Sequence, residues 1–432
     1  MNLPSSRPPS MAVIPRLVRV MGGACLSALL AIPAVAAAAD DATWARWVNR
    51  EMADLPASRA IEARLQRDRA EARAQSQPLY NPELNIGYEN SAETTRTVGL
   101  GQTLDWSGKG RSGARLGDVQ ARLAEVRAEK ARARLAVDVL SALAAYDAAQ
   151  ARLQGVREQE QRLSDLLALV RKRERAGDLG RVSAQLSYLA LGRTQQALAD
   201  AESEATAAET RLRAVFNQTA PDYPLPDAGL WEADGSVVMD AVRAKDSYDL
   251  RLARLQVMAA ERQVELAGKQ RRTDPTLGVT VGREGEDNLW GLDFSLPLPL
   301  FNTGKAEYQA ALADGDAQQA LLDQQQRALS AEVEGALIDY RQRRARWLSW
   351  RELSATRLAD AADLLQRTWQ LGEITTQDYL QGLNQRQDAL LAGIALRESM
   401  QKAWLEWLYQ SAQLDSWIEM LAAGNRGQGG QS

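Results

Sequence analysis

The chain repeats one order of strands and helix, and this internal duplication limits the folds that it can form. The first copy has alternating residues up to Leu104, then Ser107-Gly108-Lys109, then a long helical run. The second copy repeats this order about 195 residues later, with Thr303-Gly304-Lys305 before its long helical run. Because solenoid repeats are only about 20–50 residues long, we interpret the chain as two copies of one large module.

Apolar and polar residues alternate in four short segments, two before each Gly-Lys pair. A period of two predicts strands with one apolar and one polar face. Each segment has the length of a tilted membrane strand, about 9–11 residues, and its polar face is typical of a water-filled lumen. The apolar residues expected to face lipid are Leu84, Ile86, Tyr88, Val98, Leu100, Leu277, Val279, Val281, Trp290, Leu292, Phe294 and Leu296.

A small sheet packed on helices in a soluble domain is the alternative explanation of these strands. Aromatic residues near the strand ends (Tyr88, Trp106, Trp290, Phe301) favour a membrane interface instead. Four strands cannot close a membrane barrel, which needs about eight, and open sheet edges are not tolerated in hydrocarbon. Two copies would give eight strands with a filled interior, whereas three copies would give twelve strands and a channel. The sequence therefore predicts a homotrimer.

Two long runs, 109–175 and 305–371, contain no proline. At 1.5 Å per residue, each predicted helix would reach roughly 100 Å. Each run ends at a glycine (Gly177 or Gly372), which can adopt the left-handed cap conformation, and a return helix follows. Apolar spacings of three, four and seven predict coiled-coil packing at Leu116, Val119, Leu123, Val126, Val156, Leu163, Leu167 and Val170.

These patterns predict a mixed α/β membrane protein, mainly α, that trimerises into a 12-stranded β-barrel continued by a periplasmic α-helical barrel. Each chain contributes two modules, each a strand hairpin plus a long helical hairpin. The predicted boundaries are a signal peptide at 1–39, an N-terminal helical segment at 40–80, a first repeat at 81–226, a second repeat at 227–421 and a disordered tail at 422–432. The first repeat comprises a hairpin at 83–104, a long helix at 109–175 and a return helix at 182–216; the second comprises a helix at 239–269, a hairpin at 276–300, a long helix at 305–371 and a return helix at 375–421.

The N-terminus has the order of a secretory signal peptide, with a cationic stretch, an apolar core at residues 20–35 and a run of small residues. A membrane-anchoring helix is the alternative, but it needs about 20 apolar residues, and Gly22, Gly23 and Pro33 weaken this segment. Lipidation of Cys25 stays open, although a lipoprotein site has the apolar core in front of its cysteine rather than around it.

The chain contains no histidine. It therefore lacks the usual general base and the commonest transition-metal ligand. Removal of residues 1–39 takes away three arginines and no acids, which leaves 49 basic against 56 acidic residues. The sequence also has no basic domain or patch of the kind that binds nucleic acid. Beyond residue 39 no run of about 20 apolar residues offers a helical anchor. We expect no enzymatic activity, no cofactor and no metal site.

Together, the duplication, the order of strands and helices and the two glycine turns resemble the outer-membrane factor family, the TolC-like exit ducts of tripartite efflux pumps. The resemblance covers residues 45–421. Asn81-Pro82-Glu83-Leu84, Ser107-Gly108-Lys109 and Ala114-Arg115 are similar to the CzcC-like branch, which serves heavy-metal cation efflux. The resemblance implies a place in the bacterial outer membrane with a long periplasmic extension. It also implies a homotrimer in outer-membrane lipid, with a periplasmic adaptor (membrane fusion) protein and an inner-membrane RND pump as partners.

The resemblance also implies roles for the two helical turns as adaptor-docking tips and as a closed gate. By position, the tip residues are Gly177, Asp178, Leu179, Gly372, Glu373 and Ile374. Asp378 matches the first gate carboxylate of TolC-like proteins, whereas Gln381 departs from the second. Three copies of Asp378 would form a ring that attracts cations. The alternative for Asp378 is an ordinary carboxylate at a helix start, favoured there by the helix dipole.

The resulting hypothesis is an exit duct that exports heavy-metal cations without catalysis. A mature chain without histidine or cysteine suits a passive conduit, because conduction needs weak sites. One alternative keeps the channel but changes the cargo to drugs or to a protein secreted by a type I system. Alternatives of other classes are a soluble periplasmic coiled-coil scaffold and a carboxylate-dependent hydrolase.

Overall fold

The structure is a computed structural model that describes residues 41–177, 180–216 and 247–423. All of these residues lie in one compact unit, which spans Ala38–Ser432. The predicted signal peptide, Cys25, the two tip residues Asp178 and Leu179, and the end of the first predicted repeat at 217–226 lie outside the described residues. The same is true of residues 239–246 and 424–432.

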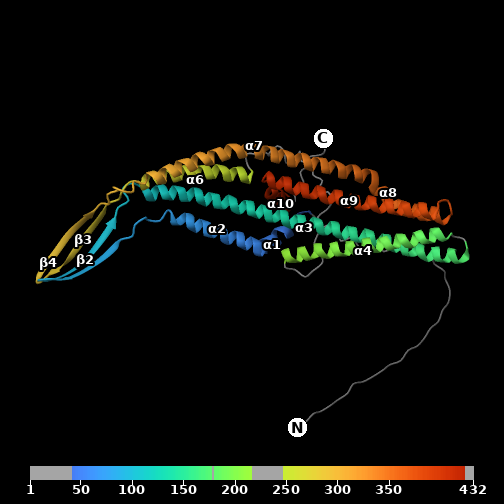
Figure 1. Cartoon of the computed structure of the whole chain (residues 1–432), viewed down its shortest axis with the longest axis horizontal. Helices are drawn as coiled ribbons and strands as arrows, with labels where there is room; N and C mark the ends of the chain where they lie inside the picture. Colours follow the sequence, from blue (N-terminus) through green and yellow to red (C-terminus); the bar gives the residue numbers. More distant parts are fainter. Residues whose placement is uncertain (1–40, 178–179, 217–246, 424–432) are drawn as a thin grey trace, which may run out of the picture. The chain divides into compact units, whose positions relative to one another are not determined.

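Two strand pairs and a set of long helices make up this unit (Figure 1). The strands lie at one end of the helices, and the α3–α4 and α8–α9 turns lie at the other. The first part of the chain forms α1 (Asp41–Asp54), α2 (Pro56–Ala74), β1 (Glu83–Asn90), β2 (Thr94–Thr103), α3 (Lys109–Ala176) and α4 (Arg181–Phe216). The second part forms α6 (Tyr248–Gln270), β3 (Thr276–Glu284), β4 (Asp287–Ser295), α7 (Lys305–Trp350), η3 (Arg351–Ala355), α8 (Thr356–Gln370), α9 (Thr376–Gln410) and α10 (Leu414–Ala422).

The four strands form one antiparallel sheet in the order β1-β2-β3-β4. The sheet joins the two repeats, because β2 of the first hairpin pairs with β3 of the second. Gly285, with φ of 60°, forms the two-residue turn between β3 and β4. A positive φ suits such tight hairpins.

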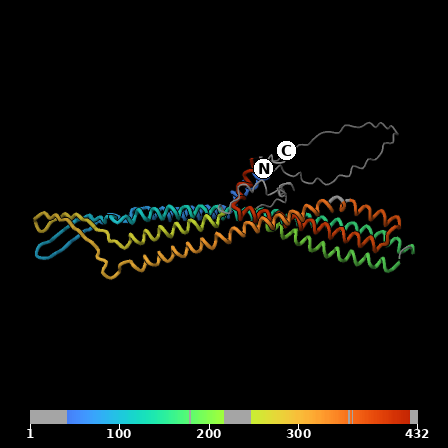
Figure 2. The backbone as a smooth tube through the Cα atoms, turned by 90° about the horizontal axis from the view of Figure 1, so that it is seen from above, coloured from blue at the N-terminus to red at the C-terminus, as the bar shows by residue number. Residues whose placement is uncertain are grey.

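Helix α3 is 68 residues long and packs against α2, α4, α6 and α9. It begins after Gly108 and ends at Gly177, both in the left-handed conformation. Figure 2 shows helices from both halves of the chain running beside one another. The eight apolar residues at the predicted seam positions of α3 are all buried, because neighbouring helices cover them.

The predicted single helix at 305–371 is interrupted, which corrects the sequence analysis. The five residues of η3 form a π-helical turn between α7 and α8. Just before it, the Trp350 indole lies flat on Gly393 of α9, where a Cβ atom would come within 2.1 Å of the ring. Its Nε1–H donates a hydrogen bond to the Ala389 carbonyl at 3.1 Å. The sequence could not indicate this turn, since the glycine that accommodates Trp350 lies on a different helix.

The predicted return helix at 375–421 is also divided. Helix α9 ends at Gln410, Ala412 adopts a φ of 55°, and α10 begins at Leu414. The Gln413 amide donates to the Leu408 carbonyl at 2.8 Å, which satisfies the end of α9. The break turns α10 onto α1, where Trp417 becomes buried. Neither glycine nor proline marks this break in the sequence.

The largest buried cluster lies where α1, α3, α7, α9 and α10 meet. Trp44, Tyr340, Trp404 and Trp407 are completely buried in it. The rings of Tyr340 and Trp404 lie 4.7 Å apart, a spacing at which aromatic pairs contribute about 0.5–1.5 kcal/mol beyond burial. This cluster joins the helices of both repeats midway between the strands and the turns.

Candidate functional site

One face of the sheet is apolar across all four strands. Ile86 lies opposite Val98, Val98 opposite Val281, and Val281 opposite Trp290. Two residues further along each strand, a second apolar row crosses the same face through Leu84, Leu100, Val279 and Leu292. Because strand register fixes which side chains share a face, the apolar residues of both hairpins form one continuous surface.

This apolar face is exposed in the single chain. Apolar patches of this extent on a protein surface usually mark an interaction with protein or membrane. All twelve residues predicted to face lipid are exposed, from 37% for Leu296 to 76% for Ile86: Leu84, Ile86, Tyr88, Val98, Leu100, Leu277, Val279, Val281, Trp290, Leu292, Phe294 and Leu296.

The opposite face of the sheet carries small and polar side chains. The Thr280 hydroxyl donates to Asp293 Oδ2 at 2.7 Å, and the hydroxyls of Thr103 and Thr276 lie 2.7 Å apart. Gly282 is required on steric grounds, because a Cβ there would come within 2.1 Å of a neighbouring backbone carbonyl oxygen. Among the described residues, β1 and β4 each pair along one side only. The sheet is therefore two-faced and open at both edges.

A buried carboxylate, Asp274, lies where the strands meet the helices. Its Oδ2 atom is 2.9 Å from Lys109 Nζ, at the start of α3. The Tyr80 hydroxyl donates to Oδ2 at 2.9 Å, and the Ser107 hydroxyl donates to Oδ1 at 2.9 Å. Asp274 precedes β3 of the second repeat, whereas Ser107 and Lys109 belong to the first repeat and Tyr80 lies just before it. This junction cluster (Tyr80, Ser107, Lys109 and Asp274) therefore joins the two modules.

Electrostatics in the junction cluster favour the ionised form of Asp274. Burial by itself would raise the pKa of this carboxyl, but the hydrogen bonds from Lys109, Tyr80 and Ser107 outweigh it and lower the pKa below the ordinary value. Burial, followed by the hydrogen bond to Asp274, raises the pKa of Tyr80. The tyrosine hydroxyl therefore keeps its proton and acts as a donor.

At the opposite end of the helices, two glycines form the turns that the resemblance assigns to adaptor docking. Gly177 and Gly372 have φ of 78° and 77°. After α8, the Gly372 amide donates to the Trp369 carbonyl, and the Glu373 amide donates to the Thr368 carbonyl. This pair of bonds is the Schellman motif that closes a helix with a left-handed residue.

The predicted tip residues of the α8–α9 turn differ in exposure. Gly372 and Glu373 are exposed, whereas Ile374 is half-buried and packs against an apolar cluster. Only Gly177 of the three predicted residues in the first tip lies in the described part of the chain.

An aromatic stack holds the two turns together. The rings of Trp369 and Tyr379 stack at 5.3 Å, and the Arg173 guanidinium lies 4.7 Å from the centre of the Trp369 ring. The Trp369 indole N–H donates to Thr376 Oγ1 at 3.2 Å. Arg173 belongs to the end of α3, so this tip cluster (Arg173, Trp369, Thr376 and Tyr379) crosses from the first repeat to the second.

Asp378 takes part in a capping box at the start of α9. The Asp378 amide donates to Thr375 Oγ1 at 3.1 Å, and the Thr375 amide donates to Asp378 Oδ2 at 3.2 Å. The Thr375 hydroxyl also donates to Oδ2, at 2.6 Å. Asp378 is therefore an exposed helix-start carboxylate of fixed orientation, whose other oxygen, Oδ1, lies outside the box.

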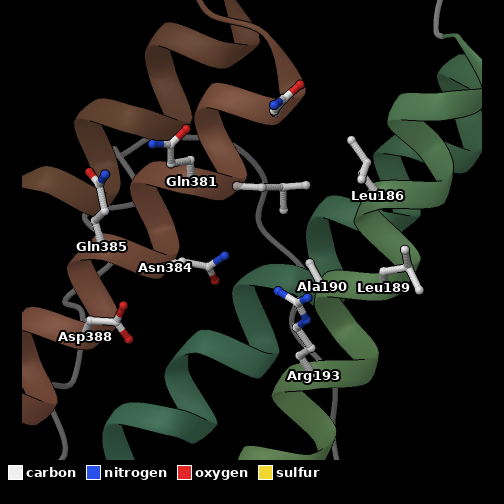
Figure 3. A pocket seen from close by; sticks show the side chains of 10 residues that line it. Leu186, Leu189, Ala190, Arg193, Gln381, Asn384, Gln385 and Asp388 are labelled. Atoms are coloured by element: carbon white, nitrogen blue, oxygen red, sulfur yellow. The ribbon is translucent and has the colours of Figure 1, made fainter.

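Gln381 lines a groove between α4 and α9, one turn after Asp378 (Figure 3). The groove has a volume of about 340 Å³. In Figure 3, Asn384 of α9 points toward Ala190 and Arg193 of α4. The lining residues are Leu186, Leu189, Ala190, Arg193, Gln377, Leu380, Gln381, Asn384, Gln385 and Asp388. The amide side chains of Gln377, Gln381, Asn384 and Gln385 can donate and accept hydrogen bonds along the face of α9 that lines the groove.

Within residues 41–177, 180–216 and 247–423, no cluster of three or more acidic, histidine or cysteine side chains could hold a metal ion. Across the same described ranges, no helix combines the length and the apolar composition needed to cross a membrane.

Sequence reasoning missed both the junction cluster and the tip cluster. A weak signal for the first exists, because Asp274-Pro275 before β3 corresponds to Asn81-Pro82 before β1. Only the later copy carries a carboxylate at this position. The tip cluster had no signal, since Arg173 lies almost 200 positions from Trp369 in the sequence.

Comparison with known proteins agrees with this geometry. The family model described as "Outer membrane efflux protein" matches residues 47–218. No curated protein matches the chain.

Three solved structures are similar to the chain at low sequence identity. The outer membrane protein VceC from Vibrio cholerae is 17% identical with a TM-score of 0.69, and the match covers 85% of this chain and 96% of that one. The outer membrane channel CmeC from Campylobacter jejuni is 12% identical with a TM-score of 0.69, covering 89% of each chain. The outer membrane channel MtrE from Neisseria gonorrhoeae, solved in its open state, is 16% identical with a TM-score of 0.66, covering 86% of this chain and 88% of that one. Residues 47–218 therefore carry the sequence pattern of outer membrane efflux proteins, and the chain has the fold of these outer-membrane proteins.

Proposed function

We propose that the chain belongs to the outer membrane efflux protein family and acts as the exit duct of a tripartite efflux system in the bacterial outer membrane. The observation that carries this proposal is the exposed apolar face that crosses all four strands in register. Such a face costs free energy in water, at about 25 cal/mol for each Å² of apolar surface, and this cost disappears in a lipid bilayer. The family match and the shared fold support the same function.

We propose a homotrimer because the sheet needs partners for β1 and β4. Unpaired strand edges are costly in hydrocarbon, where no water replaces the missing hydrogen bonds. In a trimer, β4 of one chain pairs with β1 of the next, which closes a barrel of twelve strands. The small polar side chains of the other face then line a wet lumen.

The proposed cargo is heavy-metal cations, and the support for it is the similarity of Asn81-Pro82-Glu83-Leu84 and Ser107-Gly108-Lys109 to the CzcC-like branch. The proposed partners are a periplasmic adaptor, which contacts the α3–α4 and α8–α9 turns, and an inner-membrane RND pump. In this proposal the pump selects the substrate and the duct conducts it passively.

The proposed gate is a ring of three Asp378 carboxylates, with Gln381 one turn further along α9. The exposure of Asp378 at the start of α9, next to the α8–α9 turn, supports this role. A fixed ring of three negative charges attracts cations and repels itself as it narrows.

The test is single-channel conductance of the detergent-purified protein in planar bilayers. Asp378→Asn removes the charge and keeps an acceptor for the capping box, whereas the control Thr375→Ala breaks the box and keeps the charge. We expect a small cation-selective current in the wild type, weaker cation selectivity in Asp378→Asn, and retained selectivity in Thr375→Ala.

The outcomes separate the parts of the proposal. A current with the same selectivity in Asp378→Asn would keep the channel and remove the gate. A protein that stays soluble without detergent and never inserts would refute the channel and favour a periplasmic scaffold. For the cargo, a deletion strain with normal tolerance of metal ions but increased sensitivity to drugs would assign the duct to drug efflux.

A further inference from the structure

The two repeats of the chain meet along one interface, at which β2 pairs with β3 and α3 packs against α6. This repeat interface leaves β1 and β4 as the outer edges of the sheet, with no described strand along their far sides. The two edge strands are 8 and 9 residues long, and neither contains proline or lysine. Proteins use proline, lysine and short strands to keep exposed edges from pairing. Both edges are therefore suited to pair with a further strand.

The strands of the two repeats correspond residue by residue. Each first strand starts directly after a proline: Asn81-Pro82 precedes β1, and Asp274-Pro275 precedes β3. The hairpins then pair in the same way, with Glu83 opposite Gly101 and Thr276 opposite Ser295. Strand β1 therefore corresponds to β3, and β2 corresponds to β4.

The turn that follows each hairpin is also the same. The Trp106 amide donates to the Leu104 carbonyl, and the Leu300 amide donates to the Leu298 carbonyl, both at 2.9 Å. At the repeat interface the Leu104 amide itself donates to the Pro275 carbonyl at 2.9 Å. As the counterpart of Leu104, Leu298 has the place from which the equivalent bond would reach a neighbouring copy of the chain.

These correspondences give the register in which β4 of one copy would pair with β1 of the next. In the repeat interface Leu100 lies opposite Val279. Their counterparts are Phe294 of β4 and Ile86 of β1, which would lie opposite one another between copies. The neighbouring pairs on the same face are also apolar, Leu84 with Leu296 and Tyr88 with Leu292. The apolar rows of the sheet would therefore continue from chain to chain.

The helical part of the repeat interface contains ion pairs. Side chains of α3 pair with α6 or with the segment after it: Lys109 with Asp274, Arg115 with Glu265, Glu129 with Arg251 and Lys130 with Asp249. Helices α3 and α7 both start at the lysine of a Gly-Lys pair, so their positions correspond from that residue onward. The equivalent positions on α7 are Lys305, Ala311, Gln325 and Gln326.

The equivalent positions between copies lack complementary charges. Ala311, Gln325 and Gln326 are uncharged, so no ion pair can form there. Lys305 keeps the charge of Lys109 and is exposed, but the counterpart of Asp274 in the first repeat is the neutral Asn81.

We propose that neighbouring copies pair through β4 and β1 in the register of the repeat interface, with Phe294 opposite Ile86, and that Lys305 meets Asn81 there in place of an ion pair. This inference rests on the proposed function, because it needs the homotrimer. Main-chain hydrogen bonds and apolar contacts then join the copies, whereas complementary charges join the repeats inside each chain. Since complementary charges chiefly determine which surfaces meet, they distinguish the interface inside a chain from the equivalent one between chains.

Cysteine crosslinking of the detergent-purified protein tests the register. The pair Ile86→Cys/Phe294→Cys, made in a Cys25→Ser background, is oxidised and resolved on a denaturing gel without reductant. Directly opposite residues are close enough for a disulfide, whereas residues displaced by two along one strand lie about 7–8 Å apart. We expect covalent dimers and trimers from this pair, and their loss in the displaced pairs Ile86→Cys/Leu292→Cys and Ile86→Cys/Leu296→Cys.

The equivalent pair in the repeat interface, Leu100→Cys/Val279→Cys, is the matched control. These two residues lie opposite one another within a chain, so their disulfide should leave the product at the mass of a single chain. Strands β1 and β4 lie at opposite edges of the sheet, so a disulfide between them must join two chains.

A carboxylate added at Asn81 tests the neutral interface between copies. Asn81→Asp supplies the acceptor that Lys109 finds in Asp274, and it should pair with Lys305 of the neighbouring copy. We expect the trimer to dissociate at least about ten-fold more slowly in urea, because hydrogen bonds between charged groups contribute enough for one such factor. Lys305→Met in the same protein should remove this gain. The control Asn90→Asp makes the same substitution at the far end of β1 and should bring no gain.

Several outcomes would overturn the inference. Crosslinked trimers from a displaced pair, in place of Ile86→Cys/Phe294→Cys, would refute the register. No gain from Asn81→Asp, a gain that survives Lys305→Met, or an equal gain in Asn90→Asp would refute the meeting of Asn81 with Lys305.

Conductance and mass separate this inference from the proposed function. A conducting trimer with a displaced crosslink refutes only the register. A protein that is monomeric in detergent by native mass spectrometry and gives no current in planar bilayers refutes the proposed function itself.

Discussion

Replacing Lys109 with methionine tests the junction cluster most directly. The substitution keeps the side-chain length and removes the ammonium group 2.9 Å from Asp274 Oδ2, whose side chain is only 1% exposed. Removing one partner of a buried pair typically costs about 3–5 kcal/mol, because the other charge stays buried without compensation. Asp274 keeps its hydrogen bonds from Tyr80 and Ser107, each contributing about 1 kcal/mol. We therefore expect a loss of about 1–3 kcal/mol in the free energy of unfolding.

The stability lost in Lys109→Met should depend on pH. In the wild type the pKa of Asp274 is lowered, so the stability from its ionised form is fully present above the unfolded pKa, about 3.9, and is lost as the pH falls through the lower folded pKa. In Lys109→Met, the hydrogen bond and the charge of Lys109 no longer lower the pKa of Asp274, so this pKa lies above that of the wild type and the variant's carboxyl takes up a proton at a higher pH. The stability difference between the two proteins should therefore be largest near pH 7 and shrink toward pH 4.

The assay is urea unfolding of the detergent-solubilised protein, followed by circular dichroism at several pH values. Lys305→Met is the matched control, because Lys305 holds the same place after the second glycine and is exposed. We expect it to change stability by less than about 0.5 kcal/mol. The double variant Lys109→Met/Asp274→Asn should be more stable than Lys109→Met alone, because the buried charge is gone. Equal effects of the two lysine variants, or simple additivity of Lys109→Met and Asp274→Asn, would refute the reasoning.

Three further predictions concern the helices. Gly393→Ala forces a Cβ into the Trp350 ring and should lower the unfolding free energy by about 1–3 kcal/mol. The control Gly335→Ala, in an open helix position, should raise the unfolding free energy by up to about 1 kcal/mol. Unfolding followed by circular dichroism measures both stabilities, and equal values would contradict the packing of Trp350. Trp369→Ala removes the tip stack and should lower the protection of amides in the α8–α9 turn by about 3 kcal/mol. Hydrogen exchange measures this protection, and the strand amides should keep theirs. Loss of protection over the whole chain would argue against a local cluster. Gly372→Ala has room for its Cβ but must adopt a left-handed φ, so it should cost about 1–2 kcal/mol in the same turn, and wild-type exchange rates there would show that the turn tolerates other conformations.

Local patterns in the sequence indicate most of the secondary structure for clear physical reasons. Alternation places Ile86, Val98, Val281 and Trp290 on one face, and the strand register aligns them into one row. Glycine is the residue that most readily adopts a positive φ, so Gly177 and Gly372 are recognisable as helix ends without any structure. These predictions depend only on residues close to one another in the chain.

The features that the sequence left open depend on distant partners. The π-helical turn follows Trp350, whose ring needs the absent side chain of Gly393. The break after α9 exists because α10 buries Trp417 against α1 and α9. For Asp378, the sequence allowed both a gate and a helix cap; the structure contains the cap, and the gate stays a proposal.

Periodicity, proline-free runs and glycine ends act over a few residues, so these local signals are enough to specify a duplicated chain of paired strands and long helices. They also place an apolar face on each hairpin. Lys109 and Lys305 are alike in the sequence, but in the folded chain Lys109 is half-buried and paired with buried Asp274, whereas Lys305 is exposed. The physical reason is that β2 pairs with β3 within the chain, whereas the free edge of β4 has no partner among the described residues.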